Sequence, residues 1–455
     1  MSDATGISEE ASFGRRVRVD PQRFAASPLP TIANLARRPE RLILVEAGTQ
    51  RFLLLNRPSD ARELLAMDGY GLSKSYGAVR YIIGNGILTS HGKTWEVVRD
   101  RLQPAFQQDR LANMAPDINA AFDPVVERWI DDAGGDTGKP VDVMRGLVRA
   151  TLDVLLRVLA GSDGSLLAEA DIDAINLALL AASRQAWLRG AGQRAQLVAR
   201  EPGFDAAVRR LDRVAERIYR HQQRRAGPDA SPDGDAVARL AAAFQDPNCP
   251  EVTVRQLRDE LVTFLLVGHE TTAVALAWTL WLLGKEPELQ LSLRREAAGV
   301  DDGMTAKEAL AAAPLTGAVF REAMRLYPPI PVLPRVAFES TRFGSAKLIA
   351  GSFFALPVFA YQRDPAVWPQ PRRFMPERFL GSDTSLRDSP SYMPFGAGPR
   401  ACLGSRFALT EGPLGLLRIV RRISFRSAGQ RLSPIASAVT LRPAQGPHFT
   451  IERVA

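Results

Sequence analysis

Hydrophobic and polar residues follow two different periods along the chain. Residues 41–56 contain two apolar runs on either side of a glycine, the pattern of two strands joined by a tight turn. Between about residues 93 and 326 the apolar positions recur at helical spacing. After two consecutive prolines the chain turns to short apolar runs and proline-rich coil, with one more helix over 402–423 and strands beyond it. The pattern predicts a mainly α fold with a smaller β region.

Glycines recur between Gly69 and Gly92 without a stable period, which predicts a long loop that could line a pocket. Polar stretches interrupt the helical region at 131–139, 225–235 and 245–250. We find no internal repeat or low-complexity segment. We therefore expect a single domain over residues 21–455, preceded by a disordered segment over residues 1–20.

The longest apolar run, residues 261–284, is long enough to span a bilayer. His269 and Glu270 interrupt its middle, at a depth where a charged group in lipid is costly, so we expect a buried helix of the protein core. The N-terminal residues contain no apolar run of the kind that a secretion signal requires. We expect a cytoplasmic protein without a membrane anchor.

Charge and cysteine content narrow the classes of function. The net charge of +8 in 455 residues comes from arginines that are scattered along the chain, which argues against a nucleic-acid-binding tail and leaves an acidic protein partner open. The two cysteines, Cys249 and Cys402, have neither metal-binding nor disulfide spacing. They fit a reducing compartment or a single metal-ligating thiolate, and we assign Cys249 no role.

The most specific motif is Phe395-Gly396-Ala397-Gly398-Pro399-Arg400-Ala401-Cys402-Leu403-Gly404, where coil gives way to a helix. The glycines permit a tight turn that brings backbone close to a flat ligand. The helix that follows presents free N–H groups and a positive dipole to the sulfur, which favours a thiolate at Cys402.

This segment resembles the haem-binding loop FGxGxRxCxG of the cytochromes P450 and matches all six specified positions. The resemblance implies that Cys402 ligates the iron of haem b, that Phe395 packs beside the sulfur, and that Arg400 pairs with a haem propionate. Gly404 completes the motif as a haem contact. The fold expected from the resemblance is the triangular helical prism of this family, formed here by one catalytic domain.

A second motif lies inside the long apolar helix, where buried polar residues are costly unless they are used or paired. Thr271 can donate a hydrogen bond to the carbonyl of Val267, and Gly268 removes bulk there, so the helix can open and admit a small ligand. A zinc-peptidase motif would need a second histidine where Ala273 stands. A helix whose polar residues are satisfied internally is the remaining alternative for this segment.

The same segment resembles the family's oxygen-activating stretch, [AG]-G-x-[DE]-T-T. That resemblance implies that Glu270 and Thr271 deliver protons, while His269 has a structural or outer role. Val267 departs from the small residue that the family usually has, so the shape of the pocket at this point stays open. By the same resemblance we expect Val267, Gly268, Val332 and Val439 to line the substrate pocket.

Three further motifs resemble the family. Trp95 and Arg99 share one face of a predicted helix, which alone is equally typical of an ordinary amphipathic helix. By resemblance these two residues and Arg335 bind the haem propionates. The resemblance to the ExxR and PERF motifs implies a buried structural network that supports the cysteine loop and is formed by Glu322, Arg325 and Arg378.

The resemblance implies a monooxygenase that inserts one oxygen atom from O2 into a hydrophobic small molecule, of terpenoid, fatty-acyl, steroid or polyketide type. No flavin, nicotinamide or iron–sulfur motif is present, so we expect electrons from a separate ferredoxin and ferredoxin reductase, and a monomeric enzyme. The alternatives are a peroxide-using or rearranging haem-thiolate enzyme and a non-catalytic haem sensor. Retention of an acid and an alcohol in the helix disfavours both alternatives.

Overall fold

The structure of the chain is a computed structural model. It describes residues 15–26, 28–67, 72–74, 77–134, 139–162, 164–188, 202–225, 235–246, 250, 252–343, 346–348, 350–381, 384–428, 436–437, 440–443 and 446–454. Cys249 and Val439 lie outside these residues.

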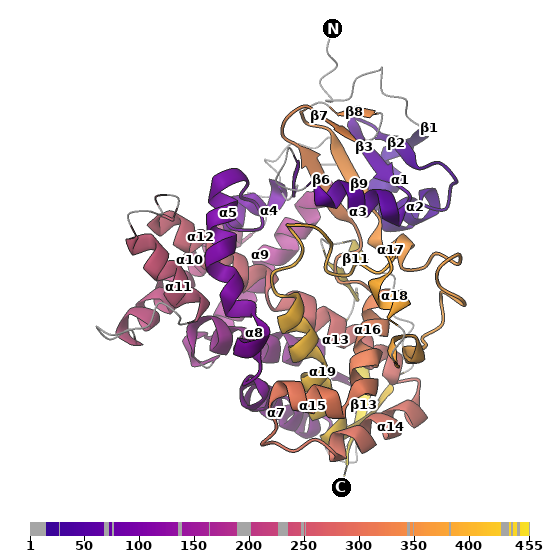
Figure 1. Cartoon of the computed structure of the whole chain (residues 1–455). Coiled ribbons are helices and arrows are strands. Elements are labelled where there is room, and N and C mark those ends of the chain that lie inside the picture. Colours follow the sequence, from indigo (N-terminus) through magenta and orange to yellow (C-terminus); the bar gives the residue numbers. More distant parts are fainter. Residues whose placement is uncertain are drawn as a thin grey trace.

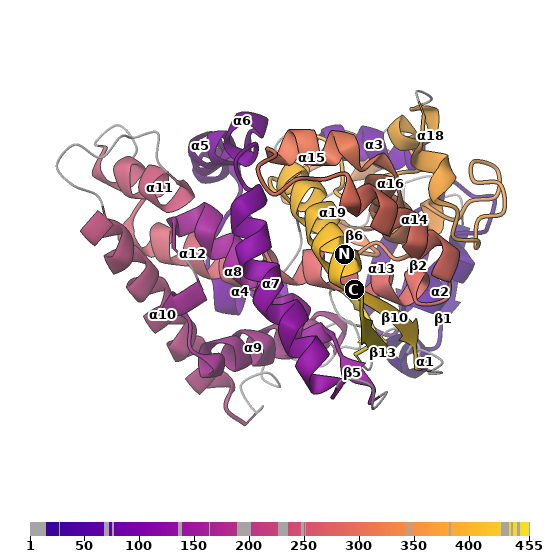
Figure 2. The same ribbon diagram turned by 90° about the horizontal axis from the view of Figure 1, so that it is seen from below.

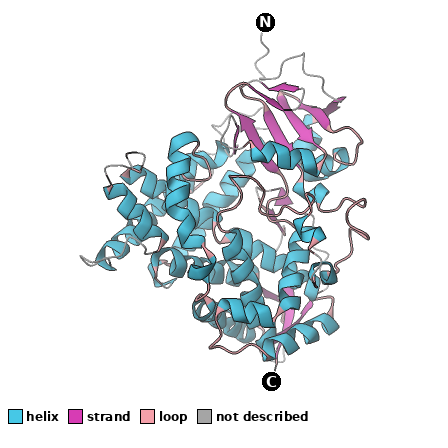
Figure 3. Ribbon diagram, viewed as in Figure 1, coloured by secondary structure: helices cyan, strands magenta, loops and turns pink. Residues whose placement is uncertain are grey.

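Helices make up most of the described chain, and the largest group of strands lies near the N-terminus, with further strands near the C-terminus (Figures 1 and 3). The helices in chain order are α1 (Pro21–Ala26), α2 (Pro28–Leu35), α3 (Pro58–Ala66), α4 (Gly77–Ile83), α5 (Gly92–Leu102), α6 (Gln108–Leu111), α7 (Ala115–Asp132), α8 (Met144–Ala160), α9 (Glu169–Leu188), α10 (Phe204–Arg225), α11 (Ala236–Gln245), α12 (Val254–Val267), α13 (Glu270–Leu283), α14 (Pro287–Ala298), α15 (Ala306–Ala312), α16 (Pro314–Leu326), α17 (Val358–Tyr361), α18 (Ser385–Asp388) and α19 (Ser405–Arg422). The expected mainly α fold with a smaller β region is confirmed.

The largest sheet has the strand order β1-β2-β3-β9-β6-β4. Its strands are β1 (Arg15–Val19), β2 (Leu42–Ala47), β3 (Gln50–Leu55), β4 (Leu72–Lys74), β6 (Leu333–Ala337) and β9 (Phe353–Leu356). The predicted strand pair is β2 and β3, and Gly48 turns between them with a φ of 63° that glycine adopts without strain. The expectation of disorder through residue 20 is wrong for residues 15–19, because β1 pairs in parallel with β2.

The remaining strands form smaller sheets. β10 (Ile423–Ser427), β13 (His448–Arg453) and β5 (Val141–Asp142) form one sheet, and two pairs consist of β11 (Ala436–Ser437) with β12 (Leu441–Arg442) and β7 (Thr341–Phe343) with β8 (Ala346–Leu348). The predicted loop between Gly69 and Gly92 instead contains β4 and α4. The pairing of β4 with β6 explains the difference, since the partner strand is 260 residues away in sequence and gives no local signal.

The main hydrophobic core lies among the central helices. Viewed from below, α7, α8, α13 and α19 lie close together in the body of the molecule (Figure 2), and their buried apolar side chains belong to one cluster. Residues 254–283 form the one helical run in the described chain that is long and apolar enough to cross a membrane. Because 83% of that apolar stretch is buried within the protein, it is a core helix, as expected from the charged residues in its middle.

A buried charged network fixes the segment that leads to the cysteine loop. Arg325 donates two hydrogen bonds to Glu322, of 2.7 and 2.8 Å, and neither side chain is exposed to solvent. The guanidinium also donates to the carbonyls of Gln362 and Pro371 at 2.8 Å and of Arg373 at 3.1 Å. These bonds hold α16 against the chain between residues 362 and 373.

Arg378 completes this network, as expected from the sequence. Its Nε lies 3.5 Å from Glu322 Oε1, and the same carboxylate oxygen accepts a hydrogen bond of 3.0 Å from the Met375 backbone N–H. Gln362 is fully buried. Its amide donates to the carbonyls of Met324 and Arg325 and accepts from the Met393 N–H, so the glutamine joins α16 to the start of the cysteine loop.

We predict that Glu322→Gln destabilises the protein strongly, because Arg325 would keep its charge in a buried site without a carboxylate. Breaking a buried ion pair in this way costs about 3–5 kcal/mol of unfolding free energy. Chemical denaturation followed by circular dichroism measures the change. Glu288→Gln, the same substitution at an exposed position in α14, is the control and should leave stability nearly unchanged. Equal stabilities of the two variants would contradict a network that supports the fold.

Candidate functional site

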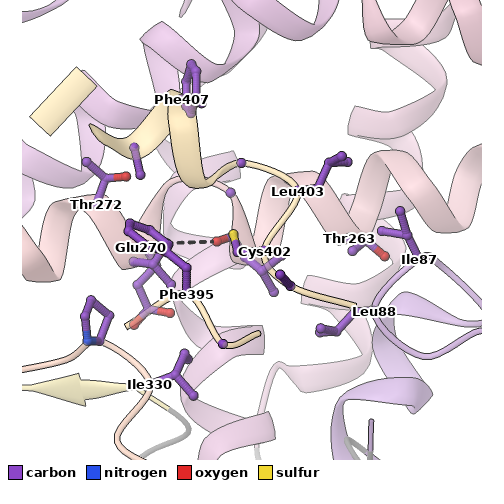
Figure 4. A pocket seen from close by; sticks show the side chains of 18 of the residues that line it. Ile87, Leu88, Thr263, Glu270, Thr272, Ile330, Phe395, Cys402, Leu403 and Phe407 are labelled. Carbon is purple, nitrogen blue, oxygen red and sulfur yellow. Dashed lines mark hydrogen bonds between the residues drawn. The ribbon is translucent and has the colours of Figure 1, made fainter. Parts of the chain in front are cut away.

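A cavity of about 240 Å³ lies between the two regions that the sequence motifs single out. One wall consists of residues 394–396 and 400–404 with the start of α19, and the other consists of the end of α12 and the start of α13. Figure 4 shows Phe395, Cys402 and Leu403 of the first wall around the same space as Glu270 and Thr272 of the second. The cavity therefore brings the predicted metal ligand and the predicted acid to one site.

The cysteine loop is a compact turn stabilised by its own backbone. The N–H of Cys402 donates to the carbonyl of Phe395 at 2.9 Å, and that of Ala401 donates to Gly398 at 3.0 Å. Gly396 and Gly398 have φ angles of 72° and 73°, in the left-handed region that favours glycine. The tight turn expected from the glycine spacing is confirmed.

Gly398 has a role that the sequence did not indicate. It does not line the cavity, and a Cβ atom on it would lie 2.0 Å from the carbonyl oxygen of Leu65, in α3. The glycine thus lets the loop pack against the backbone of a helix more than 300 residues earlier in the chain. Gly396 does line the cavity, as expected for a residue that lets backbone approach a flat ligand.

The Cys402 side chain is accessible within the cavity. Burial in the protein raises the pKa of its thiol, and this effect outweighs the lowering by Lys74, by a hydrogen bond from the Gly404 N–H and by Arg99. Burial thus opposes the thiolate that the turn and the helix terminus were expected to favour. Coordination of a cation by the sulfur would supply the missing stabilisation of the negative charge.

Four cationic side chains line the cavity together with Cys402. They are Lys74, Arg99, Arg335 and Arg400, whereas Glu270 is the only carboxylate among the described residues of the lining. Arg335 and Arg400 are 1% and 2% exposed. Lys74 was not predicted, although it lies within the stretch that the glycines marked as a pocket loop. A cavity with this charge distribution suits a ligand that carries negative groups.

Three of the predicted cofactor-binding residues form a connected group. Arg99 donates a hydrogen bond of 3.0 Å to the carbonyl of Ala401, next to the cysteine. The Arg400 guanidinium lies 4.7 Å from the centre of the Trp95 ring, and it donates to Ser73 Oγ at 3.2 Å and to the carbonyl of Ser90 at 2.5 Å. Trp95 and Arg99 lie on one face of α5, as their spacing predicts.

The loop after α4 forms another part of the wall and is fastened to α12. Asp259 accepts a hydrogen bond of 2.7 Å from the Asn85 N–H, and Glu260 accepts one of 2.9 Å from the Ile87 N–H. Burial raises the pKa of Glu260 to about 8. Ile87 and its neighbour Leu88 face the cavity (Figure 4), so the expectation that this stretch lines a pocket is confirmed.

The long apolar helix is interrupted at the cavity. α12 ends at Val267 and α13 begins at Glu270, with a turn over Gly268 and His269 between them. Thr271 Oγ1 donates to the Val267 carbonyl at 3.4 Å, as predicted. A Cβ atom on Gly268 would lie 2.8 Å from the Phe264 carbonyl oxygen, so the glycine relieves crowding at the interruption. The expected local opening of the helix is confirmed.

Glu270 is buried at the start of α13 and has partners on a different element. Its Oε1 accepts a hydrogen bond of 3.1 Å from Thr440 Oγ1 and lies 3.5 Å from an Arg442 nitrogen. Burial raises the pKa of the Glu270 carboxyl, against the lowering influence of Arg442 and Thr440. Burial lowers the pKa of His269 to about 4, so this neighbour is neutral near pH 7.

Only some of the four residues expected in the substrate pocket line the cavity. Val267 and Gly268 line the cavity, and Val439 lies outside the described residues. The expectation for Val332 is wrong, because this side chain packs on the apolar cluster around Phe52 and Phe353 on the sheet. Its neighbours Ile330 and Leu333 line the cavity instead. Adjacent side chains at the start of an extended strand point to opposite sides, which separates Val332 from Leu333, and the sequence did not indicate which of the two faces inward.

A haem group, which the motif resemblance implies, fits the residues around this cavity. Its iron can take one protein thiolate, which Cys402 offers within the cavity, and its two propionates suit the lining cations. The planar macrocycle is apolar, and so are most residues on the two walls. The residues of the site thus offer a ligand for the iron, cations for the propionates and apolar walls for the macrocycle.

Comparisons with known proteins agree with this fit. The family model for cytochrome P450 matches residues 23–448. The chain is 29% identical to "Cytokinin hydroxylase" of Arabidopsis thaliana, covering 93% of this chain and 83% of that protein. It is 31% identical to "Cyclooctatin synthase" of Streptomyces melanosporofaciens, covering 78% and 76%, and 30% identical to "Putative cytochrome P450 135A1" of Mycobacterium tuberculosis, covering 88% and 85%.

We predict that Gly398→Ala lowers the unfolding free energy by about 2 kcal/mol or more. The substitution forces a left-handed backbone on alanine and pushes its Cβ into the Leu65 carbonyl. Gly303→Ala is the control, because a Cβ atom at Gly303 meets no atom within 4 Å. Thermal unfolding of both variants measures the difference. If Gly398→Ala is as stable as the control, the contact with α3 does not constrain the loop.

Proposed function

The chain belongs to the cytochrome P450 family and is a monooxygenase with haem b as its cofactor, and we propose that it hydroxylates, or oxidises in a related way, a hydrophobic small molecule. The observation that carries this proposal is the placement of Cys402 and the Glu270–Thr271 pair on two walls of one largely apolar cavity. A ligand for iron and a source of protons thus adjoin the space available to a substrate.

Cys402 would ligate the haem iron, and Phe395 would pack beside the sulfur. Arg335, Arg400 and Arg99, with Trp95 and Lys74, would hold the propionates by charge-assisted hydrogen bonds. When bound, the haem supplies reductive activation of dioxygen, which thiolate ligation favours. The buried network of Glu322, Arg325 and Arg378 supports the loop that carries the cysteine.

Glu270 and Thr271 would supply protons at the opposite wall. The elevated pKa of the Glu270 carboxyl brings it closer to neutral pH, where an acid is most effective as a proton donor. Thr271 lines the cavity next to this acid, and its hydroxyl can accept one hydrogen bond while it donates another. The pair can therefore pass a proton from the buried acid to a small ligand in the cavity.

The cavity wall favours an apolar substrate. Val79, Leu88, Leu179, Phe264 and Ile330 contribute apolar side chains, which suit a terpenoid, fatty-acyl, steroid or polyketide-like molecule. One relative is named a cyclooctatin synthase and another a cytokinin hydroxylase, and these names refer to different molecules. The substrate class is thus proposed from the lining of the cavity.

Val267 and Gly268 are proposed to shape the substrate end of this cavity. Both line it where the helix is interrupted, and the valine is bulkier and stiffer than the residue that is usual in the family. The side chain would hold a substrate to a narrow range of orientations.

Family membership implies O2, a substrate and a redox partner. We further propose a ferredoxin and its reductase as the partner proteins, with the chain acting as a monomer in the cytoplasm. The net charge of +8 supports an acidic electron donor. The burial of the apolar run over residues 254–283 supports a location away from lipid for that segment.

Two other functions compete with this proposal. A peroxide-using or rearranging enzyme would need no proton delivery during oxygen reduction, and a haem sensor would need no acid at the ligand site. The buried position of Glu270 beside the cavity therefore argues against both. Product formation with an NAD(P)H-driven ferredoxin system, compared with peroxide alone, distinguishes a monooxygenase from these alternatives.

We predict that Cys402→Ala removes the reduced carbon-monoxide absorbance typical of thiolate-ligated haem, because no other described cysteine lines the cavity. The spectrum of the dithionite-reduced protein under carbon monoxide measures the loss. Cys249→Ala is the matched control and should keep the band. A thiolate band that survives in Cys402→Ala would show that another sulfur ligates the iron.

We predict that Thr271→Ala lowers the yield of product per NAD(P)H by about tenfold or more and raises peroxide release, because proton delivery is disturbed. Thr279→Ala is a close control, since Thr279 makes the same type of bond, to the Ala275 carbonyl at 2.7 Å, but does not line the cavity. Parallel measurement of NAD(P)H consumption, peroxide and product gives the yield. Equal coupling in both variants would remove Thr271 from the mechanism.

A further inference from the structure

The polar partners of Glu270 come from a C-terminal hairpin, for which the family resemblance implied only pocket lining. Strands β11 and β12 pair with the register Ala436–Arg442 and Ser437–Leu441. Thr440 and Arg442 reach Glu270 from this hairpin at 3.1 and 3.5 Å, across 170 residues of sequence. The acid is thus held by a separate structural element and not by its own helix.

The hairpin is itself anchored to the core near α13. Trp278 Nε1 donates a hydrogen bond of 2.6 Å to the Leu441 carbonyl, and the Leu441 N–H donates one of 2.8 Å to the Pro329 carbonyl. Trp278 lies two helical turns after Glu270 in α13. Two contacts from one helix, at Glu270 and at Trp278, therefore fix residues 440–442 against it.

Arg442 connects the acid to the outside of the cavity. The side chain of Glu270 is 6% exposed and faces the cavity, and Thr440 also lines it, whereas Arg442 is absent from the lining and is 19% exposed. The guanidinium therefore lies between the carboxylate and solvent. A proton taken up on the solvent side would meet Glu270 without passing the substrate.

Other charged groups near α13 leave Arg442 as the main electrostatic partner of Glu270. His269 is neutral near pH 7 because burial lowers the pKa of its ring to about 4. From α19, Glu411 is buried, which raises the pKa of its carboxyl well above the usual range and favours the uncharged form.

The remaining neighbours of α13 are paired elsewhere. In α16, Glu322 and Arg325 bind each other, and in α8 the Asp153–Arg157 pair is 3.2 Å apart. In α14, Glu296 accepts hydrogen bonds from the backbone N–H groups of Leu315 and Thr316. The four cations of the cavity lining are the residues that we propose to hold the propionates.

We propose that Thr440 and Arg442 are positioning residues for proton delivery: they orient the Glu270 carboxyl and link it to solvent at the C-terminal hairpin. This inference rests on the proposed function of Glu270 as the proton donor. In each proton transfer, the Glu270 O–H bond would break and its proton would pass by way of the Thr271 hydroxyl into the cavity, where the bound haem would supply the oxygen chemistry. Water on the Arg442 side then returns one proton to the carboxylate, and electrons come from the redox partner.

The direction of the pKa effect follows from charge. An adjacent guanidinium stabilises the ionised carboxylate and lowers its pKa, and a hydroxyl that donates to the carboxylate acts in the same direction. Removing Arg442 leaves only the Thr440 hydroxyl to oppose burial, so the Glu270 pKa rises further and the carboxyl stays protonated to higher pH. The acid would then release its proton less readily at neutral pH.

The test follows the Glu270 carboxyl by infrared spectroscopy of the haem-loaded protein. The band of the protonated carboxyl is identified as the one that is lost in Glu270→Gln, and its pH midpoint is then measured in each variant. We expect Arg442→Gln to raise the midpoint by about 1–3 units, Thr440→Val to raise it less, and Arg442→Lys to restore most of the wild-type value. Arg426→Gln, at an exposed arginine in β10, is the control and should not move it.

Two further measurements complete the experiment: the product yield per NAD(P)H and the carbon-monoxide spectrum. In Arg442→Gln the product yield per NAD(P)H should fall several-fold at neutral pH, while the thiolate band stays normal. An unchanged midpoint in Arg442→Gln and Thr440→Val, in a protein whose wild type forms product, would overturn this inference alone. A wild type without NAD(P)H-driven product would overturn the proposed function instead. If Arg442→Gln does not fold, the midpoints of Thr440→Val and Arg442→Lys decide the outcome.

Discussion

The site depends on a fully buried ion pair between Glu322 and Arg325. The Arg325 guanidinium has five N–H donors, and five hydrogen bonds use them: two to Glu322 and three to backbone carbonyls of residues 362, 371 and 373. A buried charge is tolerable only when its hydrogen bonds are satisfied in this way. Because the three carbonyls belong to the chain that leads to the cysteine loop, the pair determines where that loop can lie.

The local motifs were predictable because their structure depends on nearby residues. The cysteine turn follows from glycine spacing within ten residues, and the opening of the long helix follows from Gly268 and Thr271 within one helical turn. Glu322 and Arg325 could be paired from their spacing of three on a helix. The family resemblance then supplied the roles that spacing alone leaves open.

Contacts between distant parts of the chain account for what the sequence did not predict. Gly398 meets Leu65, Lys74 enters the cavity from a strand paired with β6, and Thr440 reaches Glu270 from a hairpin. Each depends on the packing of elements far apart in sequence, for which one sequence has no periodic signal. The misplacement of Val332 has a similar cause, since an alternating pattern separates two faces of a strand but does not say which one a cavity will occupy.

Electrostatic differences between the two walls allow one buried cavity to hold an anion at Cys402 and an acid at Glu270. Burial raises the pKa of both Cys402 and Glu270, so in each case it disfavours the anion. At Cys402 the cations of Lys74 and Arg99 and the Gly404 N–H oppose this effect, and a metal ion would complete the balance in favour of a thiolate. At Glu270 Arg442 is the single opposing guanidinium, and it lies outside the cavity lining. Desolvation is therefore outweighed at the Cys402 wall, where a permanent anion results, whereas at the Glu270 wall it leaves an acid that can gain and lose a proton.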